Sequence, residues 1–202
     1  MVIETATAAC SVALLEGGAV IDARHEVVGR GHAERLLPMI AELTGGGRAD
    51  AIRVDCGPGS FTGIRVGLAA ARGLGLGWDV PVSGFSALPL VAARAFADAP
   101  EADALAVVME GGHGEVFVQC FDRPHRPRSS FASLRPDAAL AAIAPELWIV
   151  GDGTRHLADS GRRVEARHPC AADLVLLTDE QVALPATPIY GRAPDAKLPG
   201  AR

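Results

Sequence analysis

Apolar residues in the first half of the chain fall into short runs that alternate with stretches of helical spacing. The runs predict five strands, at residues 2–6, 9–15, 19–27, 51–56 and 81–85. Helices are predicted at about 31–44, within the glycine-rich stretch 57–77, and at about 86–98. Pro38 lies inside the first helix, so that helix either begins late or bends at the proline.

The order of these elements is β-β-β-α-β-α-β-α. It predicts an antiparallel three-stranded meander that continues into two parallel strands through crossover helices. This is the order of the ribonuclease-H-like core shared by the actin, hexokinase and Hsp70 superfamily. We therefore predict an α/β, actin-like fold with a mixed five-stranded sheet in an N-terminal lobe of residues 1–99.

The second half of the chain is less regular. Its predicted elements are a hairpin at 105–121 that turns at Gly111-Gly112, a helix at about 136–144 and a strand at 147–153 followed by a short helix. The arginine-rich loop at 122–130 is predicted to be exposed, and the chain after about residue 178 to be extended. Residues 100–202 are too few for the full second lobe of a nucleotide-using member, so we predict a smaller, degenerate lobe.

The helix in the glycine-rich stretch carries an unusual row of small residues. Gly63, Gly67, Ala71 and Gly75 recur every four residues and so lie along one side of the helix. A helical glycine costs roughly 1 kcal/mol relative to alanine, so the row requires a compensating close approach. The approaching backbone belongs either to the chain's own sheet or to a partner helix, and both are possible because the helix has two sides.

Composition and charge restrict the class of protein. Of 202 residues, 49% are hydrophobic and 21% are charged, as in globular proteins, and the net charge is −5. That charge argues against the chain alone binding nucleic acid through a broad basic face. No apolar run approaches the roughly 20 residues of a membrane span, and the N-terminus lacks a signal-peptide pattern, so we predict a cytoplasmic protein. The four cysteines are far apart and are predicted to be reduced.

Two short segments stand where this superfamily keeps its phosphate loops. Glu4, Thr5 and Thr7 follow the first strand, and Gly151, Asp152 and Gly153 follow a later one. A working first loop has an aspartate and a glycine, whereas this chain has Glu4 and Ala6, and neither a GxGxxG nor a P-loop motif is present. A vestigial phosphate site is the most that these segments predict, and turn and cap roles explain them equally well.

Other candidate chemistry is weak. Ser60 lies in a strand-to-helix turn, but Pro58 and Thr62 depart from the G-x-S-x-G elbow, and a triad with His32 and Asp55 would depend on the fold. His32 lacks the second histidine of a helical HxxxH pair because Leu36 stands there, so no metal site is predicted. The Arg123–Arg128 loop is at best a minor RNA contact.

Several segments of the chain resemble the TsaB (YeaZ) family. They are GPGSFTGIRVGLAAARGLGLGWDVPVSGFSAL at 57–88, ETATAACSVAL at 4–14, GHAERLLPMI at 31–40, GEVF at 114–117 and PIYGRAPDAK at 188–197. These matches are collinear over nearly the whole chain. Glu4 departs from the family's usual aspartate, and Gly111-Gly112 replaces a polar pair, which puts the role of Glu110 in doubt.

The resemblance implies a noncatalytic subunit of the complex that adds threonylcarbamoyl to N6 of adenosine 37 in tRNAs reading codons that begin with A. It implies TsaD, the catalytic paralogue, and TsaE, an ATPase, as partners, with tRNA bound only within the complex. ATP and metal are expected on those partners rather than on this chain. The alternatives are a glycopeptidase-like (M22) protease, a weak nucleotide-dependent enzyme, or a homodimer that uses the same helices.

The resemblance also implies a four-helix interface formed by the first helix and the glycine-rich helix with the same pair of the partner. The residues expected at it are His32, Leu36, Leu37, Ile40, Phe61, Gly63, Ile64, Gly67, Leu68 and Ala71.

Overall fold

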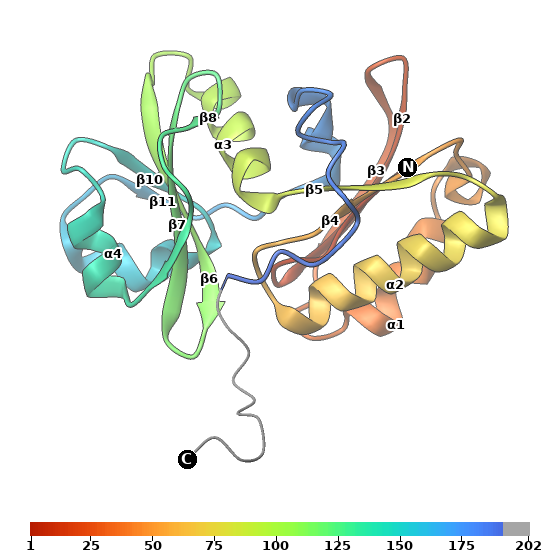
Figure 1. Ribbon diagram of the computed structural model, residues 1–202, viewed down its shortest axis with the longest axis horizontal. Helices are drawn as coiled ribbons and strands as arrows, with labels where there is room; N and C mark the ends of the chain where they lie inside the picture. Colours follow the sequence, from red (N-terminus) through yellow and green to blue (C-terminus); the bar gives the residue numbers. More distant parts are fainter. Residues whose placement is uncertain (192–202) are drawn as a thin grey trace.

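The first sheet is the mixed five-stranded sheet predicted from the order of elements. The computed structural model, which describes residues 1–191, orders its strands β3-β2-β1-β4-β5 (Figure 1). Strands β1, β2 and β3 are antiparallel, and β4 and β5 continue the sheet in parallel with β1. The strands are β1 (Val2–Glu4), β2 (Ala9–Glu16), β3 (Ala19–Val27), β4 (Ile52–Asp55) and β5 (Val82–Phe85). The ribonuclease-H-like, actin-like fold class is confirmed.

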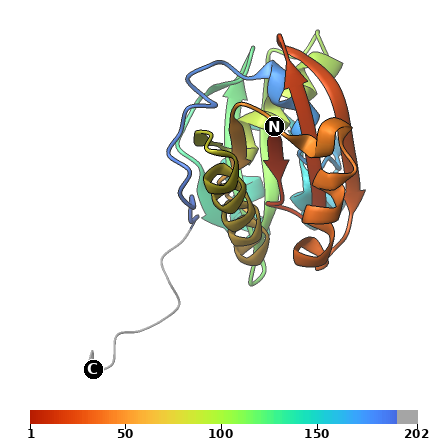
Figure 2. The ribbon, with the colours of Figure 1, turned by 90° about the vertical axis from the view of Figure 1, so that its right-hand side faces the viewer.

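Helices α1 (His32–Ala41) and α2 (Phe61–Trp78) lie side by side on one face of this sheet (Figures 1 and 2). The other face is covered by α3 (Ala87–Asp98) and the short helix η3 (Ala171–Leu176). Strand alternation separates the two sides. Ile3 and Val54 pack toward α1 and α2, whereas Val2 and Phe85 pack with η3.

The first helix is shorter than predicted. It includes Pro38 but ends at Ala41, and a 3-10 turn, η1 (Thr44–Gly47), follows it. The three consecutive glycines from Gly45 to Gly47 all have positive φ, a conformation that a right-handed helix does not contain. The glycines therefore end the helical path before the fourth strand.

The second sheet has the order β11-β10-β6-β7-β8, with β9 also paired to β7. One face carries α4 (Pro136–Ala142) and the 3-10 helix η2 (Asp152–Ser160), and the other face packs on α3. Its strands are β6 (Ala104–Gly112), β7 (Glu115–Asp122), β8 (Arg126–Pro127), β9 (Ala132–Leu134), β10 (Trp148–Val150) and β11 (Val164–Glu165).

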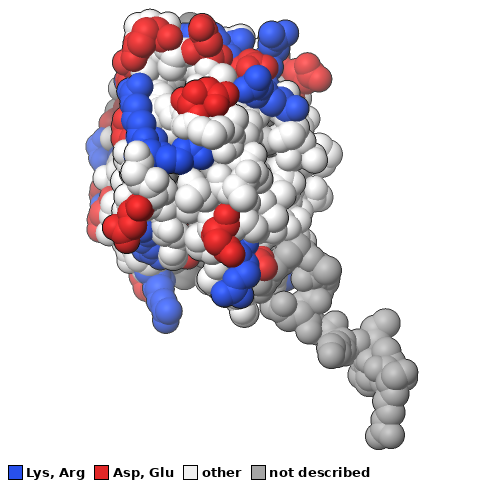
Figure 3. All heavy atoms as spheres, turned by 90° about the vertical axis from the view of Figure 1, so that its left-hand side faces the viewer, with Lys and Arg blue, Asp and Glu red and all other residues white. Residues whose placement is uncertain are grey.

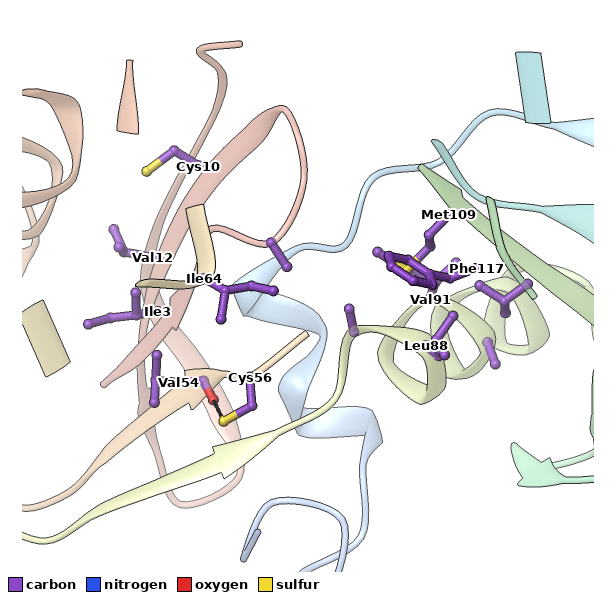
Figure 4. Close-up of a cluster of buried hydrophobic side chains, with 14 of the residues drawn as sticks. Ile3, Cys10, Val12, Val54, Cys56, Ile64, Leu88, Val91, Met109 and Phe117 are labelled. Atoms are coloured by element: carbon purple, nitrogen blue, oxygen red, sulfur yellow. Dashed lines mark hydrogen bonds between the residues drawn. The ribbon is translucent and has the colours of Figure 1, made fainter. Parts of the chain in front are cut away.

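The largest of three apolar clusters runs through both lobes. Figure 4 shows Ile3, Val54 and Ile64 in the first lobe, and Leu88 and Val91 of α3 beside Met109 and Phe117 of the second sheet. Helix α3 packs against the first lobe on one side and against the second sheet on the other, so it joins the two sheets.

One prediction about the second half is wrong in detail, and another is incomplete. The hairpin turns at His113-Gly114, because Gly111 and Gly112 remain within β6, where the register shifts. The 122–130 loop is mostly exposed, as predicted, but it is anchored at Arg123. The Arg123 side chain donates hydrogen bonds to the carbonyls of Phe96 in α3 and of Ala99 and Ala102 just beyond it.

The division of the chain at residue 99 does not hold for its last part. Helix η3 packs on the first sheet, where the Ser11 Oγ accepts the Ala171 N–H at 2.8 Å. Farther on, Gly84 and Leu184 exchange two backbone hydrogen bonds, and the Ile189 N–H donates to Cys56. Residues 171–191 therefore return to the first lobe.

No helix among residues 1–191 is long and apolar enough to cross a membrane.

Candidate functional site

The glycine-rich turn before α2 is a tightly packed helix entry. The Ser60 N–H donates to the Ala6 carbonyl at 2.6 Å, and the Ser60 Oγ accepts the Gly63 N–H at 3.2 Å. A Cβ on Gly59 would lie 2.1 Å from the Ala6 carbonyl oxygen, so only glycine fits there. Ser60 is thus the N-cap of α2.

The triad of Ser60, His32 and Asp55, which the sequence left to the fold, is not assembled. Asp55 Oδ1 accepts the Gly57 N–H at 2.6 Å, and His32 Nε2 lies 3.0 Å from the Ala9 carbonyl oxygen. Since Ser60 caps its own helix, the three side chains serve separate local contacts. Among residues 1–191, no group of three or more His, Cys, Asp or Glu side chains is placed to hold a metal ion.

The row of small residues on α2 faces the chain's own sheet. A Cβ on Gly63 would lie 2.0 Å from the Thr5 carbonyl oxygen, and one on Gly67 would lie 2.4 Å from Thr5 Oγ1. On Gly75 it would lie 2.4 Å from a methyl group of Val82. Of the two explanations for the row, the structure therefore supports close packing within the chain.

This packing corrects most of the predicted partner interface. A residue that is already covered by its own fold cannot contact a partner without a rearrangement. Eight of the ten predicted residues are buried, namely His32, Leu36 and Ile40 on α1 and Gly63, Ile64, Gly67, Leu68 and Ala71 on α2. Of the ten predicted residues, Leu37 and Phe61 are exposed, at 53% and 54%.

The outer face of α2 carries a second row of small residues that the sequence reasoning missed. Ala69, Gly73 and Gly77 are exposed and are spaced by four residues. A Cβ added to Gly73 or Gly77 would have no atom within 4 Å, so no contact inside the chain explains these two glycines. Leu76 beside them is 87% exposed. The signal was available as a second period of four in the same helix.

An aromatic and arginine cluster extends this outer face toward the start of α2. The Arg65 guanidinium lies 3.5 Å from the centre of the Phe61 ring and donates to the Tyr190 hydroxyl at 3.1 Å. The Phe61 and Tyr190 rings are 5.7 Å apart. Tyr190 comes from the returning C-terminal segment, so its place beside α2 could not be inferred from spacing along the chain.

The side chains of the first predicted phosphate loop are used in local contacts. Glu4 Oε1 accepts the Ala6 N–H at 2.7 Å, and the Thr5 hydroxyl donates to the Gly63 carbonyl at 2.8 Å. Thr7 Oγ1 accepts the Ala9 N–H at 3.2 Å. These bonds shape the β1–β2 connection and hold it against α2.

The second predicted loop is explained by packing on β6. A Cβ on Gly151 would lie 2.1 Å from the Val108 carbonyl oxygen, and one on Gly153 would lie 2.8 Å from the Met109 carbonyl carbon. Asp152 Oδ1 accepts the N–H of Glu110 at 3.0 Å. The Glu110 carboxylate itself forms an ion pair with Arg155 at 2.9 Å.

The two loops bring carboxyl groups together between the lobes. Glu4 and Asp55 are completely buried, and burial raises the pKa of both well above the usual range. Burial also raises the pKa of Asp152 to about 6, and its charge repels Glu4. An acidic junction of this kind is unfavourable for a phosphate group, because like charges repel strongly in a dry environment.

Comparison with known proteins identifies the relatives of this chain. The family model described as tRNA N6-adenosine threonylcarbamoyltransferase (TsaD) matches residues 21–124. The Escherichia coli tRNA threonylcarbamoyladenosine biosynthesis protein TsaB is 33% identical over 92% of this chain and 81% of its own length.

Two solved structures from Pseudomonas aeruginosa are also similar. One, described as an uncharacterized protein with similarity to peptidase YeaZ, has a TM-score of 0.79 and 32% identity, covering 95% of this chain and 98% of its own. The other, YeaZ, has a TM-score of 0.76 and 30% identity, covering 94% and 97%. The fold, the collinear segments and these relatives agree. The chain belongs to the TsaB (YeaZ) family.

Proposed function

We propose that this chain is an accessory subunit of the machinery that adds threonylcarbamoyl to N6 of adenosine 37 in tRNA. The name of the Escherichia coli relative supports a role in threonylcarbamoyladenosine biosynthesis. The match to the TsaD family model supports a chain related to the transferase itself. The proposed partner is TsaD, with TsaE as a further partner, and the proposed location is the cytoplasm.

The chain acts in this proposal as a scaffold and activator without chemistry of its own. The support is local: Ser60 caps a helix, His32 contacts a backbone carbonyl, and both predicted phosphate loops are held by internal contacts. ATP and metal then belong to the partner subunits. A peptidase or nucleotide-dependent enzyme is not favoured, because no observed constellation among residues 1–191 supports either chemistry.

The outer face of α1 and α2 is the proposed docking surface for TsaD. The observation that carries this assignment is the pair Gly73 and Gly77, which are costly in a helix and unexplained by contacts within the chain. Small residues let a partner helix approach closely, while Leu37, Phe61 and Leu76 supply exposed apolar contact area. A homodimer through the same face is the competing occupant.

Binding of tRNA is proposed to occur only within the complex. The net charge of −5 gives the chain no overall attraction to a phosphate backbone. Figure 3 shows charges of both signs scattered around an uncharged centre on the second lobe, without a continuous basic patch among the described residues of that face.

Co-purification with TsaD, followed by a modification assay, tests the proposal. The chain alone should show no modification activity. When it is combined with TsaD and TsaE, modification activity should be restored. Gly73→Leu should weaken TsaD binding by about tenfold or more without lowering the unfolding midpoint, because leucine is the better helix former and meets open space there. Val27→Ser, which changes a 61% exposed residue on β3, is the matched control. Modification activity from the chain alone would reject the scaffold role. Unchanged TsaD binding by the Gly73→Leu variant would reject the proposed docking face.

Light scattering separates the two possible occupants of the face. If a homodimer uses α1 and α2, adding TsaD should convert it into a heterodimer, and Gly73→Leu should weaken both. A homodimer that survives in the TsaD complex would place self-association on another surface.

A further inference from the structure

Glu4 and Asp55 are side by side in the first sheet. Strands β1 and β4 are parallel neighbours in which Ile3 is opposite Val54, so the next residue of each strand projects to the same side. That side is the one covered by α3 and η3. Both carboxyl groups are 0% exposed, which makes them the most deeply buried acids of the described chain.

Each of these carboxyl groups has one oxygen without a hydrogen-bond partner. Glu4 Oε1 and Asp55 Oδ1 accept backbone N–H groups, but Glu4 Oε2 and Asp55 Oδ2 have none within reach. Among residues 1–191, no lysine, arginine or histidine forms an ion pair with either group. The groups facing Glu4 are the hydroxyl of Ser11 on β2, the thiol of Cys170 before η3, and the carboxyl of Asp152 from the second lobe.

We propose that Glu4 and Asp55 retain one shared proton at neutral pH, carried on Glu4, so that the pair has a single negative charge. Two ionised carboxylates side by side, buried and without a cation, would repel each other strongly. Asp55 is the better site for the charge because its Oδ1 accepts the Gly57 N–H at 2.6 Å and the carboxyl group lies near the Ala87 N–H at the start of α3. Glu4 Oε1 accepts the Ala6 N–H, but the Glu4 carboxyl also faces the charge of Asp152.

The direction of the pKa shifts agrees with this arrangement. Burial raises the pKa of Glu4, the charges of Asp55 and Asp152 raise it further, and the Ala6 N–H and the Ser11 hydroxyl partly oppose these effects. Burial also raises the pKa of Asp55, where the N–H groups of Gly57 and Ala87 oppose it and no acidic neighbour adds to it. The two groups titrate as a pair. A divalent cation between the orphan oxygens would also relieve the repulsion. Magnesium and calcium prefer six or more oxygen ligands, and these two oxygens provide few of them.

A retained proton makes stability depend on pH with a defined sign. Above about pH 4.5 the unfolded chain releases the Glu4 proton while the native chain keeps it. The unfolding equilibrium constant therefore rises about tenfold per pH unit until the pH reaches the pKa of the folded pair. Glu4→Gln carries a neutral amide at this position, so it should flatten this slope and be more stable than the wild type at pH 8. Glu16→Gln, which removes an exposed carboxylate, is the control and should leave the slope unchanged.

Carbon-13 NMR of the side-chain carboxyl carbons in the wild-type chain tests the proton directly, independently of how any variant folds. The Glu4 carbon should keep the shift of a protonated acid at pH 7 and change only at higher pH. Urea unfolding in EDTA and in millimolar magnesium should give the same midpoint. Two ionised carboxyl shifts at pH 7 would overturn the proposal. So would a magnesium-dependent rise in the midpoint that Glu4→Gln abolishes, because it would assign a cation to the site. Neither result depends on the proposed function.

Discussion

Replacing Gly63 by alanine tests whether the inner row of α2 serves the chain's own fold. Alanine is the better helix former, so a helix that was free on this side would gain stability. In this structure the added Cβ would lie 2.0 Å from the Thr5 carbonyl oxygen. We therefore expect the opposite sign: Gly63→Ala should lower the free energy of unfolding.

The magnitude follows from the distance and from what the Cβ would meet. Contacts below 3.0 Å are essentially never seen for real Cβ atoms, so α2 and β1 would have to separate by about 1 Å. Overpacking of this kind costs about 1–3 kcal/mol, and the helix propensity of alanine recovers about 1 kcal/mol. A backbone carbonyl cannot rotate away, so the upper part of the range applies, and the net loss should be about 2 kcal/mol.

The same helix contains matched controls. Gly73→Ala places its Cβ in open space, so the free energy of unfolding should rise by about 0.5–1 kcal/mol. Gly67→Ala should lie between the two, because its Cβ would meet the side-chain oxygen of Thr5 rather than backbone. That oxygen can move, at the expense of its hydrogen bond to the Gly63 carbonyl.

Urea unfolding followed by circular dichroism measures all three variants. A two-state change in stability should shift the midpoint and leave the slope m unchanged. For a chain of this length, 1 kcal/mol corresponds to about 2–4 °C in the thermal midpoint. If Gly63→Ala is as stable as the wild type, or if Gly73→Ala loses as much as Gly63→Ala, the assignment of the two rows is wrong.

Two further predictions concern the junction between the lobes. Arg123→Ala removes hydrogen bonds to carbonyls at and beyond the end of α3 and should lower the free energy of unfolding by about 2–3 kcal/mol, measured by thermal unfolding. The control Arg128→Ala changes an exposed side chain and should change stability by less than about 0.5 kcal/mol. Burial raises the pKa of Asp152 to about 6, so the native state holds a proton that the unfolded chain releases between about pH 4 and 6. Stability should therefore fall as pH rises through this window. In urea unfolding at several pH values, Asp152→Asn should reduce the slope of stability against pH by the equivalent of about one proton. An unchanged slope would contradict the raised pKa of Asp152.

The first lobe could be predicted from the sequence because its signals are local and repeated. Alternating apolar runs and helical spacing identify each element within a few residues, and the order of the elements then restricts the topology. The second lobe was harder. Gly111 and Gly112 favour a turn by composition, yet the strand pairing continues past them, because long-range hydrogen bonding decides where a hairpin turns. Composition correctly predicted that most of the 122–130 loop is exposed, but it did not show that Arg123 binds backbone carbonyls at and beyond the end of α3.

The partner interface expected from the resemblance stays a prediction, and most of the residues named for it are buried in the chain's own fold. A resemblance identifies which helices matter but does not say which side of a helix is inside. Leu36 and Ile40 have the apolar character expected of an interface, and the structure buries both in the chain's own core. Tyr190 illustrates the converse: it joins Arg65 from 125 positions farther along the chain, a contact that no local pattern encodes.

Helix α2 has a glycine row on each side, and the two rows have different physical explanations. Fold packing explains Gly63, because a side chain there would clash with the backbone of Thr5, directly after β1. It does not explain Gly73 or Gly77, where a side chain would meet nothing and alanine would be the more stable choice. Gly73 and Gly77 lower the stability of the helix, and no contact within the described chain compensates for that loss. The simplest compensation is a contact with a partner in an assembly. The outer row is therefore a stronger argument than the inner row that the chain works with a partner.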